Sequence, residues 1–270
     1  MEKLSFWSSV GKCLQLYFDN FGKIFLPFLW PYLWSLGALI IYFIGFILTI
    51  VLTTNHLTII AMILLLITLV LSFAIYIKAL VRYIMLFPAT AIVTKKLLFN
   101  NEVPDYKTAL QEVRDDGWKL AKVILWEIPI ALVFMIASMS ITFPIFFSMA
   151  KNPTMISEKY LALVGVAGIM VIFMALFQLS LIFVSQVFAF RKDLCALDCL
   201  IENFRMIGRH FLPVVSVVLI WCIGSFIIGL IPLMGFLLST AICICIPVFI
   251  ILPTYWYLRF TEENEEEKGE

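Results

Sequence analysis

The chain has 270 residues, of which 63% are hydrophobic and only 14% are charged, and 19 basic residues against 18 acidic ones give a formal net charge of +1. A water-soluble domain carries about 25% charged residues, so this composition excludes an ordinary soluble protein and indicates a chain solvated by lipid. The basic residues are mixed with acidic ones on amphipathic segments, a pattern that points to anionic lipid rather than nucleic acid.

Six apolar stretches are long enough to cross a membrane, since a hydrocarbon core about 30 Å thick needs about 20 helical residues. We therefore predict an all-α membrane protein with six transmembrane helices. Polar or helix-breaking residues join the spans in pairs: Thr53–His56 the first pair, Lys151–Lys159 the second, and Pro232 with Gly235 the third. We expect three hairpins, with spans at 24–53, 57–87, 123–148, 160–190, 211–231 and 235–257.

A segment with helical periodicity, too polar to span a membrane, precedes each predicted hairpin. The three segments are 5–23, 105–122 and 193–210, and we expect each to lie along the cytoplasmic interface as an amphipathic helix. The predicted apolar faces are Phe6, Val10, Cys13, Leu14, Tyr17 and Phe21; then Tyr106, Leu110, Val113, Gly117 and Ala121; then Leu194, Leu197, Ile201, Phe204 and Gly208.

Matching residues recur when the chain is compared with itself. A shift of 186 positions matches Cys13, Gly22 and Pro27 to Cys199, Gly208 and Pro213, and a shift of 96 matches further residues of the first segment to the second. We predict three parallel copies of one unit inside a single membrane domain at 1–260. The alternative is that amphipathic helices entering a membrane select similar residues independently. The predicted copies are about 5–90, 105–190 and 193–260, followed by an acidic tail at 261–270.

The basic residues predict the orientation, because Lys and Arg flanking a span are retained on the cytoplasmic side. With the N-terminus inside, all of the 19 basic residues except Lys151 and Lys159 are cytoplasmic. We therefore expect both termini in the cytoplasm.

Enzyme, cofactor and metal motifs are not recognisable in the sequence. His56 and His210 fall on opposite sides of the predicted membrane, so they cannot form one site. The six cysteines lie in the membrane or on its cytoplasmic side, where disulfides do not persist. A metal at Cys243 and Cys245 is the alternative to a packing role, but neither has a histidine or carboxylate nearby. We predict no catalytic residue, no cofactor and no metal.

A few polar residues fall inside the predicted spans. Arg82 and Glu127 lie about one turn from the cytoplasmic ends of their spans, at matching depth, and are a candidate intramembrane ion pair. The alternative is that Arg82 extends to the headgroups while Glu127 reaches water. Gln178 and Gln186 are expected to make hydrogen bonds between helices.

A basic amphipathic helix placed just before an apolar span recurs at Asp19–Pro27, Asp115–Val123 and Arg205–Pro213, with turns expected at Leu86–Pro88 and Leu252–Pro253. This pattern resembles bacterial inner-membrane proteins of the YciC-like type and the membrane domain of glycerophosphoryl diester phosphodiesterases. The resemblance implies a six-span protein of the bacterial inner membrane. No hydrolase pattern occurs in the chain, so no phosphodiesterase activity is implied.

Our leading functional hypothesis is a non-enzymatic inner-membrane protein whose amphipathic helices engage anionic lipid, with a role in envelope organisation or as an accessory to a protein partner. Lys23, Lys119 and Arg209 are the candidate lipid contacts, because each ends an amphipathic segment just before a span. The alternative is a small-solute or ion transporter or channel, which the six spans and the pairing of Arg82 with Glu127 would favour.

Overall fold

The computed structural model describes residues 6–100, 105–151, 179–216 and 247–261, with isolated positions at 165, 168–169, 172–173, 176–177 and 218–219. Every regular element in this described part is a helix, and no strand occurs there. The chain divides into two compact units, which are described separately below. One unit comprises Val10–Arg114 and Ile242–Leu252, and the other comprises Met1–Ser9, Asp115–Ala241 and Pro253–Glu270.

Three helices are long and apolar enough to cross a membrane, which confirms the prediction of an all-helical membrane protein at this level. They are α2 (Phe21–Thr54), α3 (Thr58–Asn100) and α5 (Gly117–Lys151), and apart from Leu57 they contain the predicted spans 24–53, 57–87 and 123–148. The spans predicted at 160–190, 211–231 and 235–257 lie partly or wholly outside the described residues. Six spans in three hairpins, the single domain at 1–260 and the three repeat units therefore stay predictions.

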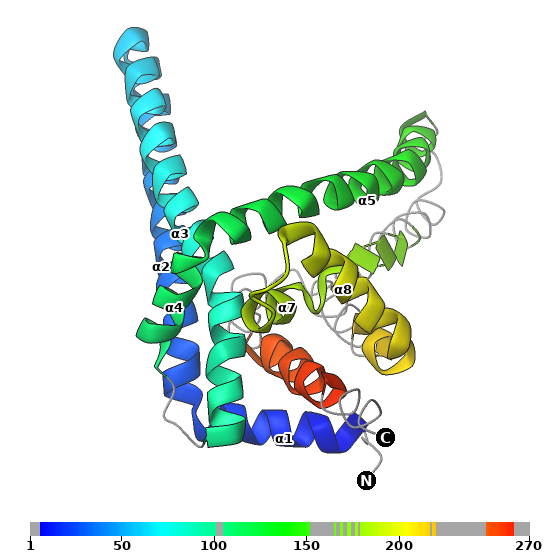
Figure 1. Cartoon of the computed structure of the whole chain (residues 1–270). Helices are drawn as coiled ribbons and strands as arrows, with labels where there is room; N and C mark the ends of the chain where they lie inside the picture. Colours follow the sequence, from blue (N-terminus) through cyan, green and yellow to red (C-terminus); the bar gives the residue numbers. More distant parts are fainter. Residues whose placement is uncertain are drawn as a thin grey trace, which may run out of the picture. The chain divides into compact units, whose positions relative to one another are not determined.

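The α2 and α3 helices pack side by side in opposite directions (Figure 1). Their contacts pair early residues of one helix with late residues of the other: the Phe28 ring meets the Tyr83 ring, and the Lys78 ammonium lies over the Trp34 ring. Nearer the turn, the Thr49 hydroxyl donates to the Ala61 carbonyl at 3.5 Å. The chain reverses between the two helices with a left-handed φ of 62° at His56, a conformation that histidine adopts more readily than most residues.

Short helices precede the long ones, each separated from the next by a single non-helical residue. The break residues are Asn20, Asp116 and His210, and helix resumes at the next residue in each case. The first two breaks are 96 positions apart, in agreement with the sequence match. The third is 190 positions from the first, one helical turn more than the shift of 186. The short helices are α1 (Phe6–Asp19), α4 (Tyr106–Asp115) and α8 (Ala196–Arg209).

All three amphipathic segments differ from the prediction: Phe21 belongs to α2, Leu194 precedes α8, and the second segment is divided. The break at Asp116 divides 105–122, so that Gly117 and Ala121 belong to the first turns of α5 rather than to the surface helix. An amide hydrogen bond from Leu120 to the Asp116 carbonyl begins the new helix. The described amphipathic part of this segment is therefore only the ten residues of α4.

Two expected turns are wrong. Pro88 lies inside α3, and Pro253 lies inside the helical segment 247–261. A proline removes one backbone donor and bends a helix without ending it when neighbouring groups and packing compensate. Around Pro88 the hydroxyls of Thr90 and Thr94 donate to the carbonyls of Leu86 and Thr90, at 2.7 Å each, and this stretch of α3 is buried.

The second unit is built around α7 (Val184–Phe190), α8, α5 and the end of segment 247–261. Aromatic rings fill its core: Phe183 lies against Tyr257 and Phe260, and Phe190 stacks on Tyr257. Phe183, Tyr257 and Phe260 are all nearly inaccessible to solvent. This aromatic core fixes the position of α7 and, through it, that of α8.

Gly45 lies where α2 packs closely against α3, because a Cβ added there would lie only 2.6 Å from the Thr68 Cβ. We predict that Gly45→Val separates the two helices and lowers the free energy of unfolding by about 1–3 kcal/mol. Thermal unfolding in detergent measures the effect. Gly37→Val on the same helix is the matched control, since a Cβ at Gly37 meets nothing within 4 Å. Equal losses in the two variants would contradict this account.

Candidate functional site

The surface of the α8 helix divides into three stripes around its axis. One face is buried against the rest of its unit and is largely apolar. Because residues three and four apart share a face, the buried positions form one continuous stripe. The residues of this packed face are Ala196, Cys199, Leu200, Asn203, Met206 and Ile207.

A second apolar stripe of α8 is exposed. Leu197, Ile201 and Phe204 are 41%, 49% and 47% accessible and follow one another at helical spacing. Three residues of the predicted face therefore lie on one exposed side of α8, whereas Leu194 precedes the helix. A third stripe, next to the exposed apolar one, carries Asp198, Glu202, Arg205 and Arg209. A helix lying in a membrane interface has this combination of an apolar side and an adjacent charged side.

The α1 helix shows the same division. Its buried side consists of Ser9, Cys13 and Tyr17. Its exposed apolar side includes Trp7, 74% accessible, and Phe18, 66% accessible. The shorter α4 helix does not share this pattern, because Tyr106, Ala109 and Val113 are buried, Leu110 is partly buried and the exposed residues are polar.

A buried asparagine holds α8 against a break in the preceding apolar segment. The helix is interrupted at Ile182 and Phe183. The Asn203 side chain accepts a hydrogen bond from the Phe183 amide at 2.8 Å and donates one to the Ser180 carbonyl at 2.6 Å. Asn203 is completely buried. One side chain thus satisfies two backbone groups that the interruption leaves without helical partners. Sequence reasoning missed this residue, because an asparagine among charged neighbours looks like a surface position.

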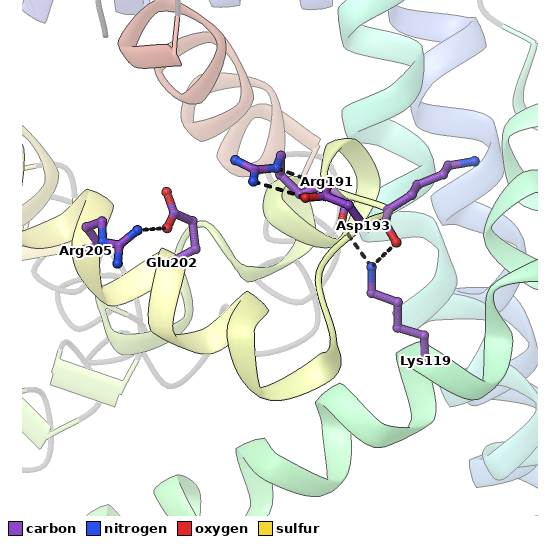
Figure 2. Close-up of polar contacts among 6 residues, drawn as sticks. Lys119, Arg191, Asp193, Glu202 and Arg205 are labelled. Atoms are coloured by element: carbon purple, nitrogen blue, oxygen red, sulfur yellow. Dashed lines mark hydrogen bonds and ion pairs between the residues drawn. The ribbon is translucent and has the colours of Figure 1, made fainter. Parts of the chain in front are cut away.

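Charged groups gather where α7 ends and α8 approaches α5 (Figure 2). The Lys119 ammonium donates to the carbonyl of Arg191 at 3.0 Å and to that of Lys192 at 3.5 Å. The Arg191 guanidinium pairs with Asp193 at 3.1 Å, and this hydrogen bond lowers the pKa of the Asp193 carboxyl. The Lys192 ammonium nitrogen lies 3.9 Å from a carboxylate oxygen of Asp116. Lys119 therefore has partners within the protein, at the carbonyl end of a helix, where a cation is favoured.

The other residues singled out from the sequence lie in different places. Lys23 is exposed in the first turn of α2, and Arg209 is exposed in the last turn of α8. Arg82 is exposed on α3, and Glu127 is partly buried on α5. Arg82 and Glu127 belong to different units, so their pairing stays a prediction, as do the lipid contacts of Lys23, Lys119 and Arg209.

The predicted hydrogen bond from Gln186 to another helix is present. Its side-chain amide is hydrogen-bonded to the Thr254 hydroxyl at 3.3 Å, and both residues are buried. This bond connects α7 to segment 247–261. Gln178 lies outside the described residues.

Two of the three thiols within the described part are suited to packing, and the third, Cys195, is exposed. Cys13 and Cys199 are buried, which raises the pKa of both thiols, that of Cys13 to about 12. A thiol with a raised pKa is a poor nucleophile and metal ligand at neutral pH. No group of three or more potential metal ligands occurs among the residues described. Cys222, Cys243 and Cys245 lie outside them.

A groove of about 450 Å³ runs along the α2–α3 pair. Tyr32, Tyr42, Tyr76 and aliphatic side chains line it, together with Ser35 and Ser72. The Ser72 hydroxyl is buried and has no hydrogen-bond partner. This lining is too apolar to hold a hydrated ion, since few polar groups converge on one point.

Comparison of the chain with protein-family models, with curated proteins and with solved structures gave no match.

We predict that Asn203→Ala lowers the free energy of unfolding by about 2–4 kcal/mol, because it leaves the Phe183 amide and the Ser180 carbonyl buried without partners. Chemical unfolding in a mild detergent measures this loss. Arg205→Ala is the control on the same helix. Its partner Glu202 is 2.8 Å away, but the pair lies at the surface, where such a bridge contributes less than about 1 kcal/mol. A larger loss in the control would contradict the assigned role of Asn203.

His210 should make stability depend on pH. Its ring stacks on Phe260, and burial, followed by the nearby Arg209 charge, lowers its pKa below the ordinary 6.5. Because the pKa of His210 is lower in the folded chain, the unfolded chain binds more protons as the pH falls. Stability therefore falls with the pH. We predict that unfolding midpoints drop between about pH 7.5 and about pH 5.5, and that His210→Phe reduces the drop while keeping the stacked ring. An unchanged pH profile in the variant would exclude His210 as the source.

Proposed function

We propose that this protein is a non-enzymatic integral protein of the bacterial inner membrane whose amphipathic helix α8 lies in the cytoplasmic lipid interface. In this role it organises the envelope or acts as an accessory to a protein partner. The proposal includes six spans in three hairpins, arranged as three repeats, with both termini in the cytoplasm. The distribution of Lys and Arg supports the orientation, and the resemblance to YciC-like proteins supports the location.

The observation that carries the proposal is the division of α8 into a packed face, an exposed apolar stripe and a charged stripe. In water, three large exposed side chains in a row would be unfavourable. At a membrane interface the same stripe enters the acyl boundary while the charged stripe stays among headgroups. The packed face, held by Asn203, fixes the angle at which the stripe meets the lipid.

The helix break after α8 supports the same placement. The α8 helix is followed by a single non-helical residue, His210, and then by an apolar helical stretch from Phe211. A break of one residue lets an interfacial helix turn into a membrane-spanning direction within a few ångströms of chain. Continuous helix through this position would force both parts to the same tilt.

A second candidate function is transport of a small solute or ion. The observation that favours it is the interrupted helix at Ile182 and Phe183, because discontinuous spans surround substrate sites in many transporters. Asn203 already occupies the Phe183 amide and the Ser180 carbonyl at this break. We therefore place transport second.

The proposal predicts the surroundings of each face of α8 when the full chain is reconstituted in nanodiscs. We would replace the native cysteines, introduce one spin label at a time, and measure collision with oxygen, which concentrates in lipid, and with a water-soluble nickel chelate. Labels at Leu197, Ile201 and Phe204 should favour oxygen. Labels at Asp198 and Arg205 should favour the chelate.

A label at Met206, on the packed face, is the matched control and should be shielded from both reagents. The proposal fails if labels at Leu197, Ile201 and Phe204 collide with the nickel chelate as often as the label at Arg205. Shielding of the exposed stripe from both reagents would instead indicate that protein covers it, which would favour the accessory role without lipid contact.

A further inference from the structure

The α2–α3 pair carries positive charge with no acidic residue to balance it. From Asn20 to Asn101 the sequence contains no Asp or Glu, and its five basic residues are Lys23, Lys78, Arg82, Lys95 and Lys96. In the other unit, by contrast, Arg191 pairs with Asp193 and Arg205 with Glu202. No acid of α2 or α3 is available to Lys78 and Arg82 in this way.

Lys78 and Arg82 lie where this pair leaves the hydrocarbon. The 20 residues Thr58–Ile77 carry no charge, and as a helix they span about 30 Å, the thickness of the hydrocarbon core. On α2 the 20 residues Ser35–Thr54 are equally uncharged. Their large side chains are mostly exposed, as expected of lipid-facing helices. Because the two helices are antiparallel, Trp34 and Lys78 lie at the same end of the two uncharged stretches. The membrane boundary therefore falls at these residues.

The side chains at this boundary form a cluster of two cations and two indoles. The Lys78 ammonium lies 4.6 Å from the centre of the Trp34 ring. Arg82 follows Lys78 by one turn and Trp30 precedes Trp34 by one turn, and because the helices are antiparallel these steps run in the same direction. Arg82 is therefore level with Trp30. All four side chains are exposed.

The electrostatics of the cluster favour an anion between the two cations. Lys78 and Arg82 are four residues apart on one helix, an arrangement in which like charges repel. A phosphate group accepts hydrogen bonds from both, and Arg matches its geometry with two parallel donors. Indoles at the boundary of the hydrocarbon donate to polar groups of lipids while their rings stay in the apolar region.

We propose that Lys78, Arg82, Trp34 and Trp30 form a binding site for one anionic phospholipid, with its phosphate between Lys78 and Arg82 and its acyl chains along the exposed side chains of α2 and α3. The proposal rests on the proposed function in assigning the chain a lipid-contacting role. It involves a different unit from α8, so the two fail independently. It gives Arg82 a headgroup partner in place of Glu127.

The test uses the full chain reconstituted in vesicles of equal parts phosphatidylglycerol and phosphatidylcholine, re-extracted in mild detergent and analysed by native mass spectrometry. The wild type should retain one phosphatidylglycerol in preference to phosphatidylcholine. Each basic residue near an anionic surface contributes about a fivefold gain in affinity, so Lys78→Gln with Arg82→Gln should weaken retention about 25-fold. The exchanged pair Lys78→Arg with Arg82→Lys should retain the lipid.

Lys95→Gln with Lys96→Gln is the matched control, because it removes the same charge from α3 about 25 Å further along the helix. Equal loss in the control would show a general charge effect and overturn the site. If the wild type retained phosphatidylglycerol and phosphatidylcholine equally, the proposed site would be overturned. This outcome depends on no variant, so it holds even if a variant fails to fold. Failure of the α8 labels to contact lipid, with the phosphatidylglycerol result as expected, would remove the interfacial helix and leave the headgroup site standing.

Discussion

The constraint on which this structure depends is the absence of hydrogen-bond partners in lipid. A backbone segment that crosses about 30 Å of hydrocarbon must form hydrogen bonds between its own amides and carbonyls. A single segment can do so only as a helix. This explains why α5 continues through Pro129 instead of ending there. It also explains why a hydroxyl side chain within a span, such as that of Thr49 on α2, donates to the carbonyl one turn earlier.

The same constraint applies where the helix does break. At Ile182 and Phe183 the freed backbone groups are buried, and Asn203 supplies both a donor and an acceptor for them. Gln186 makes a second buried polar contact one turn further on, with Thr254. These two amide side chains join α7 to α8 and to segment 247–261. A packed scaffold of this kind keeps α8 in a fixed orientation, which an interfacial helix on a flexible tether would not have.

Two kinds of basic residue emerge from the packing. Lys119 and Arg191 have partners inside the protein: the Lys119 side chain, from α5, donates to a carbonyl at the end of α7, and Arg191 pairs with Asp193. These partners favour a structural role for both residues. Lys78 and Arg82 lie on helices without a single acid, at the edge of an uncharged stretch as long as the bilayer core is thick. Partners outside the protein are expected for the second kind, because solvating these cations with lipid phosphate removes the repulsion between them.

The sequence by itself determined the class of protein and the positions of α2, α3 and α5, because long uncharged apolar runs have one stable form in lipid. It also predicted the apolar stripe of Leu197, Ile201 and Phe204, since helical spacing is visible in the order of residues. Only the tertiary structure decided that this stripe is exposed and that the opposite side of α8, with Asn203, is packed. Periodicity shows which residues share a face, but the neighbours that cover a face come from distant parts of the chain.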